Sequence, residues 1–229
     1  MPPASRWIRA HTAYQVPMHK VRSETPPMNR PGQPPVILTR ADPVYLQWLR
    51  DDIAALREQA DVVVVSSHWR PGKKVLAYMS EIAHTAIDAG ADVVVGHGPH
   101  HFLPIEVYRG KPIFYGLGSF SFHTRQGGRK HGDWIGLMAT VELDGTTVSW
   151  AGFRFVRHNH RNETVVSAPA GEANALAKIS APSAGRGCRW GMRVYGWIWM
   201  AFRPQPEHFR FGSTAEPSRF VDIMLNSCV

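Results

Sequence analysis

Apolar residues recur at the spacing of a helix in two stretches of the chain, residues 43–59 and 75–89. The first stretch opens with Asp42 and Pro43, an N-cap residue followed by a residue that suits the first helical position. The second stretch is followed by Gly90, and glycine is the residue most often found just beyond a helix C-terminus. The pattern therefore predicts two amphipathic helices.

A run of valines follows each of these predicted helices. Residues 61–66 read Asp-Val-Val-Val-Val-Ser, and residues 92–95 read Asp-Val-Val-Val. Continuous β-branched runs of this kind are typical of parallel strands that are buried on both faces. The order helix, strand, helix, strand with short joints predicts an α/β fold.

Antiparallel strands are expected further along the chain. Two pairs of apolar segments flank the short turn sequences Arg109-Gly110-Lys111 and Asp144-Gly145. Such turns predict two β-hairpins, 105–108 with 112–115 and 134–143 with 146–156. A short helix is expected near residues 172–179.

Composition divides the chain into three parts. Residues 1–35 are rich in proline and have no sustained periodicity, which predicts an irregular arm. Residues 36–181 carry the predicted helices and strands and form one body. Residues 182–229 are rich in arginine and tryptophan without a convincing period, so we expect an atypical tail.

The overall composition excludes several classes of protein. The 229-residue chain is 44% apolar and 19% charged, which rules out a disordered, collagenous or coiled-coil protein. Two cysteines, Cys188 and Cys228, make neither a disulfide framework nor a cysteine-ligated zinc site. No apolar run approaches the roughly 20 residues of a membrane span, and the first residues lack the apolar segment of a secretory signal. From these features we expect a soluble chain that is not exported.

The net charge of +8 favours anionic partners. The basic residues are spread along the chain, and no nucleic-acid-binding module accompanies them. We therefore expect a partner among phosphates, anionic polymers and acidic lipids, and do not expect nucleic acid.

Histidines follow both predicted valine strands. Ser66-Ser67-His68-Trp69 comes after the first, and Gly96-His97-Gly98-Pro99-His100-His101 comes after the second. Ligands of α/β sheets bind outside the carboxyl ends of the strands, so both groups are expected to open onto one crevice. Neutral imidazole is the commonest metal ligand, and His97 and His100 share a glycine-rich turn. A metal or phosphate site at this edge is therefore predicted.

A third segment, residues 115–122, combines two glycines with Ser119 and Ser121 after a predicted strand. A serine nucleophile there is disfavoured, because no G-x-S-x-G context surrounds either serine. Two carboxylates lie nearby in sequence. Asp92 begins a strand and is expected at the far end of the sheet, whereas Glu106 either orients a histidine or faces solvent.

Three segments together, residues 60–69, 89–100 and 105–120, resemble the CapA family of bacterial capsule and poly-γ-glutamate synthesis proteins. The resemblance spans roughly residues 42–180 and implies a four-layer α/β/β/α metallophosphatase fold of the calcineurin-like type. It also implies that His68, His97 and His100 act as catalytic metal ligands for divalent ions, two in a complete site. Arg70, Lys73 and Ser119 would then hold the substrate, which the resemblance implies to be an anionic polymer or a phosphoester. The resemblance also implies full-length relatives that are membrane-associated or extracytoplasmic, and capsule or poly-γ-glutamate synthase components as partners.

The chain departs from this family at several points. The Gly-Asp and Asn-Asn-His motifs of the family's N-terminal half do not occur, and Ser119 stands where the family usually has asparagine. We therefore expect the chain to correspond to the C-terminal half of the domain. Two interpretations follow: a metal-dependent phosphoesterase-type hydrolase whose site is incomplete in this chain, or a non-catalytic component that binds an anionic polymer or a synthase.

Overall fold

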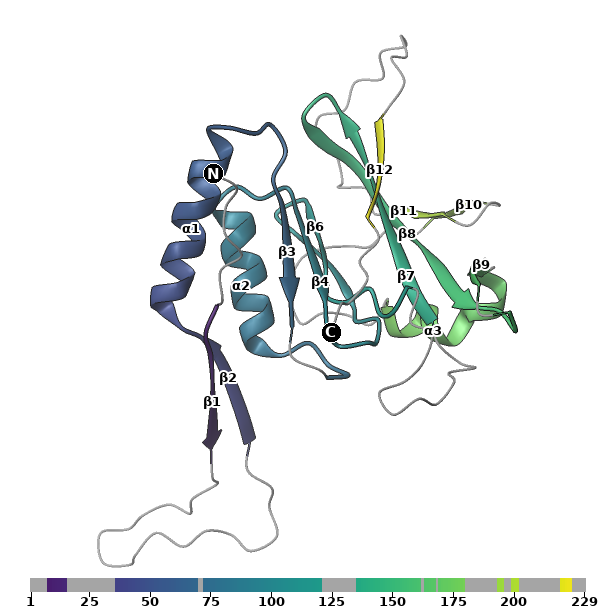
Figure 1. Ribbon diagram of the computed structural model, residues 1–229, viewed down its shortest axis with the longest axis horizontal. Coiled ribbons are helices and arrows are strands. Elements are labelled where there is room, and N and C mark those ends of the chain that lie inside the picture. The colour runs from purple at the N-terminus through teal and green to yellow at the C-terminus, as the bar shows by residue number, and fades with distance from the viewer. Residues whose placement is uncertain are drawn as a thin grey trace, which may run out of the picture.

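A computed structural model describes most of the chain between Ile8 and Ile223. The residues that it describes are 8–15, 36–69, 72–120, 135–161, 163–167, 169–179, 193–195, 199–201 and 219–223. They form an α/β protein in which two helices and two four-stranded sheets lie in successive layers (Figure 1).

The first sheet carries the two valine strands. Its order is β3-β4-β6-β5, with β3, β4 and β6 parallel and β5 antiparallel to β6. The strands are β3 (Val64–His68), β4 (Val93–His97), β5 (Ile105–Tyr108) and β6 (Lys111–Phe114). Helices α1 (Pro43–Arg57) and α2 (Ala77–Asp88) cover one face of this sheet (Figure 1). They bury Ile53, Met79 and Ile82 against Val94 and Ile113.

The second sheet packs against the other face of the first. Its order is β12-β7-β8-β9, with every neighbouring pair antiparallel. The strands are β7 (Ile135–Asp144), β8 (Thr147–His158), β9 (Thr164–Ser167) and β12 (Arg219–Ile223). Val93, Val95 and Phe114 of the first sheet share one core with Leu137 and Phe153 of the second. The first sheet is therefore covered by helices on one side and by strands on the other.

A 3₁₀ turn (Pro169–Glu172) and the short helix α3 (Ala173–Ile179) follow β9. Ala175 and Ile179 of α3 belong to the core between the sheets. The mixed α/β class is confirmed, whereas an outer helical layer on the second sheet is not formed by the residues described. The four-layer arrangement remains a prediction.

Helices α1, α2 and α3 and both hairpins confirm the elements expected from the sequence. Asp42 caps α1 by accepting a hydrogen bond from the Val44 N–H at 3.0 Å. Gly90 ends α2 with a φ of +114°, a conformation that favours glycine. Gly145 lies in the two-residue turn between β7 and β8 with a φ of +58°.

The expectation that the first valine strand is buried on both faces is wrong. Strand β3 lies at the edge of its sheet, and its burial alternates, with Val64 45% exposed. The four consecutive valines indicate strand propensity, but they do not reveal that a neighbour lies on one side alone.

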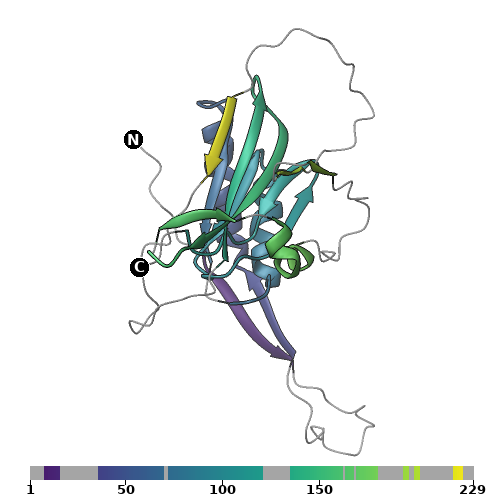
Figure 2. The same cartoon turned by 90° about the vertical axis from the view of Figure 1, so that its right-hand side faces the viewer.

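The N-terminal arm is also more regular than expected. Strand β1 (Ala10–Gln15) lies within the proline-rich region and pairs antiparallel with β2 (Val36–Ala41), which the sequence pattern did not indicate. Figures 1 and 2 show this two-stranded ribbon extending from the helical side of the body. The tail likewise contributes strands: β10 (Arg193–Tyr195) pairs with β11 (Trp199–Ala201), and β12 pairs with β7.

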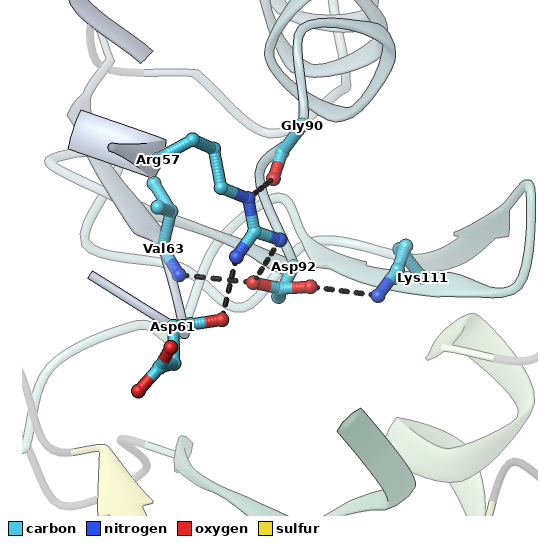
Figure 3. Close-up of polar contacts among 6 residues, drawn as sticks. All are labelled: Arg57, Asp61, Val63, Gly90, Asp92 and Lys111. Atoms are coloured by element: carbon cyan, nitrogen blue, oxygen red, sulfur yellow. Dashed lines mark hydrogen bonds and ion pairs between the residues drawn. The ribbon is translucent and has the colours of Figure 1, made fainter. Parts of the chain in front are cut away.

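Asp92 anchors the amino end of the first sheet. Its side chain is 2% exposed and accepts hydrogen bonds from Arg57 Nη2 at 2.6 Å, Lys111 Nζ at 2.7 Å and the Val63 N–H at 2.9 Å (Figure 3). Arg57 also donates to the Gly90 carbonyl at 2.7 Å. This confirms that Asp92 lies at the opposite end of β4 from His97. The carboxylate serves to join α1, β3 and β6.

Candidate functional site

His68 and His97 lie side by side at the carboxyl end of the first sheet. Each is the last residue of its strand, and the two are paired in the parallel register of β3 and β4. Their ring centroids are 4.9 Å apart and the rings are perpendicular. The prediction that these two histidines share one edge of the sheet is confirmed.

Strand alternation places this histidine pair on the face toward the second sheet. Val94 packs with the helices, whereas Val93 and Val95 pack with the second sheet. Because side chains alternate along a strand, His97 continues the row of Val93 and Val95. His68 is exposed at the sheet edge and His97 is half-buried.

Two glycines allow the strand ends to approach. A Cβ atom on Gly96 would lie 2.0 Å from Trp69 Nε1, and one on Gly98 would lie 2.4 Å from the Trp69 carbonyl oxygen. The Gly98 Cβ would also come within 2.9 Å of His68 Nε2. The Trp69 N–H donates to the His97 carbonyl at 2.7 Å, which joins the loops that follow the two strands.

His97 is held as a neutral imidazole at neutral pH. Burial is the larger cause that lowers its pKa, and electrostatic repulsion between the His97 and His68 rings lowers that pKa further. Its Nδ1 is buried and has no hydrogen-bond partner among the residues described. A neutral ring with an unsatisfied nitrogen is the form in which histidine binds a metal ion or a polar ligand.

Ser119 presents a second unsatisfied polar atom beyond strand β6. The residue is 4% exposed, and its Oγ has no hydrogen-bond partner within the described ranges. Gly136 makes room for this segment, because a Cβ there would lie 2.5 Å from the Ser119 carbonyl oxygen. Since β6 is parallel to β4, Ser119 follows the same end of the sheet as His97.

The other predicted site residues are placed differently. His100 is exposed, with a φ of +57°, in the turn after β4. Lys73 is also exposed, and Arg70 lies outside the described residues. No three His, Cys, Asp or Glu side chains among the residues described form a group that could hold a metal ion. The roles of His100, Arg70 and Lys73 therefore stay predictions.

The side chains gathered at this edge supply part of the ligands of a metal site. Two imidazoles are suitable ligands for one divalent transition-metal ion. A two-metal hydrolase centre also needs carboxylates to balance the charge of both cations. The carboxylates near in sequence do not serve the pair, since Asp92 binds Arg57 and Lys111, and Glu106 binds His84. The described residues consequently do not complete a two-metal centre.

The sequence left two alternatives open for Glu106, which either orients a histidine or faces solvent. The structure shows that Glu106 contacts a histidine, but this histidine is His84 and not one of those that follow the valine strands. Glu106 contacts His84 of helix α2 and the Tyr115 hydroxyl group. Neither His84 nor Tyr115 was a predicted site residue. Their grouping depends on contacts between α2, β5 and the end of β6, which local patterns do not encode.

Comparison with known proteins places the chain among capsule synthesis proteins. Residues 6–124 of this chain match the sequence model of a protein family that is described as bacterial capsule synthesis protein PGA_cap. The chain is 45% identical over 76 residues to the PGA biosynthesis protein CapA of Bacillus subtilis, a match that covers 31% of this chain and 19% of that protein.

Two further relatives agree with this match. A probable polyglutamine synthesis accessory protein of Mycobacterium tuberculosis is 42% identical over 95 residues, which is 39% of this chain and 24% of that protein. The capsule biosynthesis protein CapA of Bacillus anthracis is 43% identical over 65 residues, covering 28% and 16%. The matched segment thus spans about a quarter or less of these relatives. No helix among the residues described combines the length and apolar character needed to cross a membrane.

Proposed function

Because the chain belongs to the bacterial capsule synthesis protein family PGA_cap, we propose that it acts in the production of an anionic capsule polymer of the poly-γ-glutamate type. The names of its relatives support this role, since they are a PGA biosynthesis protein and a capsule biosynthesis protein. The net charge of +8 is consistent with an anionic polymer or an anionic precursor as the substrate.

The finer part of the proposal is that the histidine pair His68–His97 contributes to a metal-dependent hydrolase site of the metallophosphatase type. The observation that supports it is the pairing of two imidazoles at 4.9 Å on adjacent strand ends. A divalent ion, when bound, would polarise a phosphoryl or acyl oxygen of the substrate. The chain's own contribution is to present two imidazoles, one of them held neutral, and to place the Ser119 hydroxyl at the same end of the sheet.

Metal titration tests this part of the proposal. Zn²⁺ affinity is measured by competition with a chelating dye for the wild-type chain, His68→Ala and His97→Ala. His160→Ala serves as the control, because His160 is an exposed histidine beyond the end of β8. We expect weak binding that falls about tenfold or more in both site variants and is unchanged in the control. Equal affinity in all four proteins would refute a metal role for the pair.

A hydrolysis assay tests whether the site is complete. Because two imidazoles supply no negative charge, we expect slow or undetectable turnover of a model phosphodiester by this chain alone. Two tightly bound metal ions with turnover that depends on His97 would show instead that further ligands complete the centre.

The second candidate function is non-catalytic binding of the polymer or of a synthase component. It is favoured by the basic charge and by the lack of a three-ligand group among the residues described. Binding of poly-γ-glutamate is measured in the presence of a chelator, with duplex DNA at equal charge concentration as the control. Selective, metal-independent binding of the polypeptide would support this function over hydrolysis.

A further inference from the structure

We propose that Glu106 is a positioning residue that acts through Tyr115 on the strand end carrying His97. This inference deepens the proposed function, on which it rests for the role of the histidine pair. It draws on a cluster of four side chains outside that pair: Ser80, His84, Glu106 and Tyr115.

Glu106 is a largely buried carboxylate with two partners. Its side chain is 13% exposed; the Tyr115 hydroxyl donates to Oε2 at 2.6 Å, and His84 Nε2 lies 3.1 Å from both carboxylate oxygens. Burial raises the pKa of Glu106, but hydrogen bonds from His84 and Tyr115 outweigh that effect and lower it. Glu106 is therefore ionised at neutral pH and orients both partners.

Helix α2 holds this cluster from the other side. His84 is stacked on the Tyr108 ring at a centroid distance of 3.9 Å and an angle of 7°. The Tyr115 hydroxyl also lies 3.1 Å from Ser80 Oγ, one helical turn before His84. Burial and the charge of Glu106 raise the pKa of Tyr115, so the phenol stays protonated and keeps its donor. These contacts fix the position of the Tyr115 side chain.

The backbone of Tyr115 connects this cluster to the histidine pair. A Cβ on Gly96 would lie 2.2 Å from the Tyr115 carbonyl oxygen, so the two backbones are packed without spare room. The Leu117 N–H donates to the Gly96 carbonyl at 3.2 Å. Because Gly96 directly precedes His97, a shift of Tyr115 is transmitted to the imidazole. Trp69, next to His68, packs in the same core as Tyr115.

The test compares Tyr115→Phe, Glu106→Ala and the double variant in metal-free protein. The readout is the set of imidazole Hε1 chemical shifts of His68 and His97, recorded at one fixed pH. We expect both single variants to move the His97 signal in the same sense. The double variant should show no larger change than Tyr115→Phe alone, since the two residues act in series. Glu106→Gln keeps an acceptor oxygen for Tyr115 and should give a smaller change than Glu106→Ala.

Glu172→Gln provides the matched control. Glu172 is also a buried carboxylate, but it bonds Arg157 and Ser167 beside the second sheet. The Glu172→Gln protein should be less stable than wild type, as the Glu106 variants should be, but its His68 and His97 signals should not move. If Glu106→Ala and Glu106→Gln destabilise the fold without moving the imidazole signals, Glu106 is structural and the proposal is overturned. The signals are read without metal or substrate, so a failure of the proposed hydrolase site would be seen separately, in the metal titration.

Discussion

Single residues at the strand ends decide whether the histidine pair can form. Gly98 has a φ of +98° and no space for a side chain, because a Cβ would lie 2.4 Å from the Trp69 carbonyl oxygen. Gly98→Ala should therefore lower the free energy of unfolding by about 2–4 kcal/mol, combining backbone strain with a steric clash. Urea unfolding measures this loss.

Gly145→Ala separates the two contributions, since Gly145 has a φ of +58° but open space around it. It should cost about 1 kcal/mol. If Gly98→Ala and Gly145→Ala lower the free energy of unfolding by equal amounts, the close approach of Gly98 to Trp69 and His68 adds no steric clash.

Glu172 gives the fold a dependence on pH. The hydrogen bond from Arg157 lowers its pKa below the usual value of 4.5, more than burial raises it. A carboxyl group with a depressed pKa in the folded state stabilises the fold above its unfolded pKa, and this contribution is lost as the pH falls through the folded value. We expect Glu172→Gln to unfold at a lower urea concentration than wild type at pH 7. Between pH 5 and pH 3, its free energy of unfolding should decrease less than that of wild type. Parallel pH profiles for the two proteins would contradict this assignment.

At the scale of elements, Asp92 links α1 to the first sheet through the side chain of Arg57. Asp92→Asn removes the charge that pairs with Arg57 and Lys111, whose side chains are about one-third exposed. Breaking this link should cost about 2–4 kcal/mol, less than a fully buried pair because water reaches both cations. Asp88→Asn is the control, since its pair with Arg109 is exposed and should contribute less than about 1 kcal/mol. Because Asp92 lies at the far end of β4, the imidazole signals of His68 and His97 should not move in Asp92→Asn.

The elements that the sequence predicts are those whose signals are local. Helices α1 and α2 follow from apolar spacing and terminal residues, and both hairpins follow from their turns. Strand β1 was missed, because it gains its partner β2 only across residues 16–35. The edge position of β3 was missed for a similar reason, since the order of strands is a property of the assembled sheet.

The candidate site likewise combines residues that local sequence signals predict with residues that they do not. His68 and His97 could be predicted because each ends a recognisable strand, and the ends of parallel strands coincide. The cluster of His84, Glu106 and Tyr115 could not, because it depends on how α2 packs beside β5. Its one local signal, the one-turn spacing of Ser80 and His84 on α2, does not point to Glu106.

At the scale of the whole molecule, the edge of the first sheet at β3 offers a surface for pairing between two chains. Val64 is 45% exposed on a strand whose outer backbone groups have no strand partner among the residues described. Such edges promote pairing between chains, and a charged residue on the edge opposes it. Val64→Lys should therefore decrease the self-associated fraction in sedimentation velocity experiments at equal concentration. Val44→Lys is the control, since Val44 is 56% exposed but lies on helix α1; an equal decrease there would implicate general charge and not the strand edge.

The order of the elements along the chain has a consequence for synthesis on the ribosome. The segment from α1 to β6 is continuous and contains both histidine strands, so the helical side of the first sheet can fold as soon as residue 114 has emerged. The opposite face, with Val93, Val95 and Phe114, is covered only when β7 and β8 follow. A nascent chain paused between these stages presents an apolar surface beside the newly formed histidine pair. Chaperone binding should therefore peak in that interval and fall once β8 has been released.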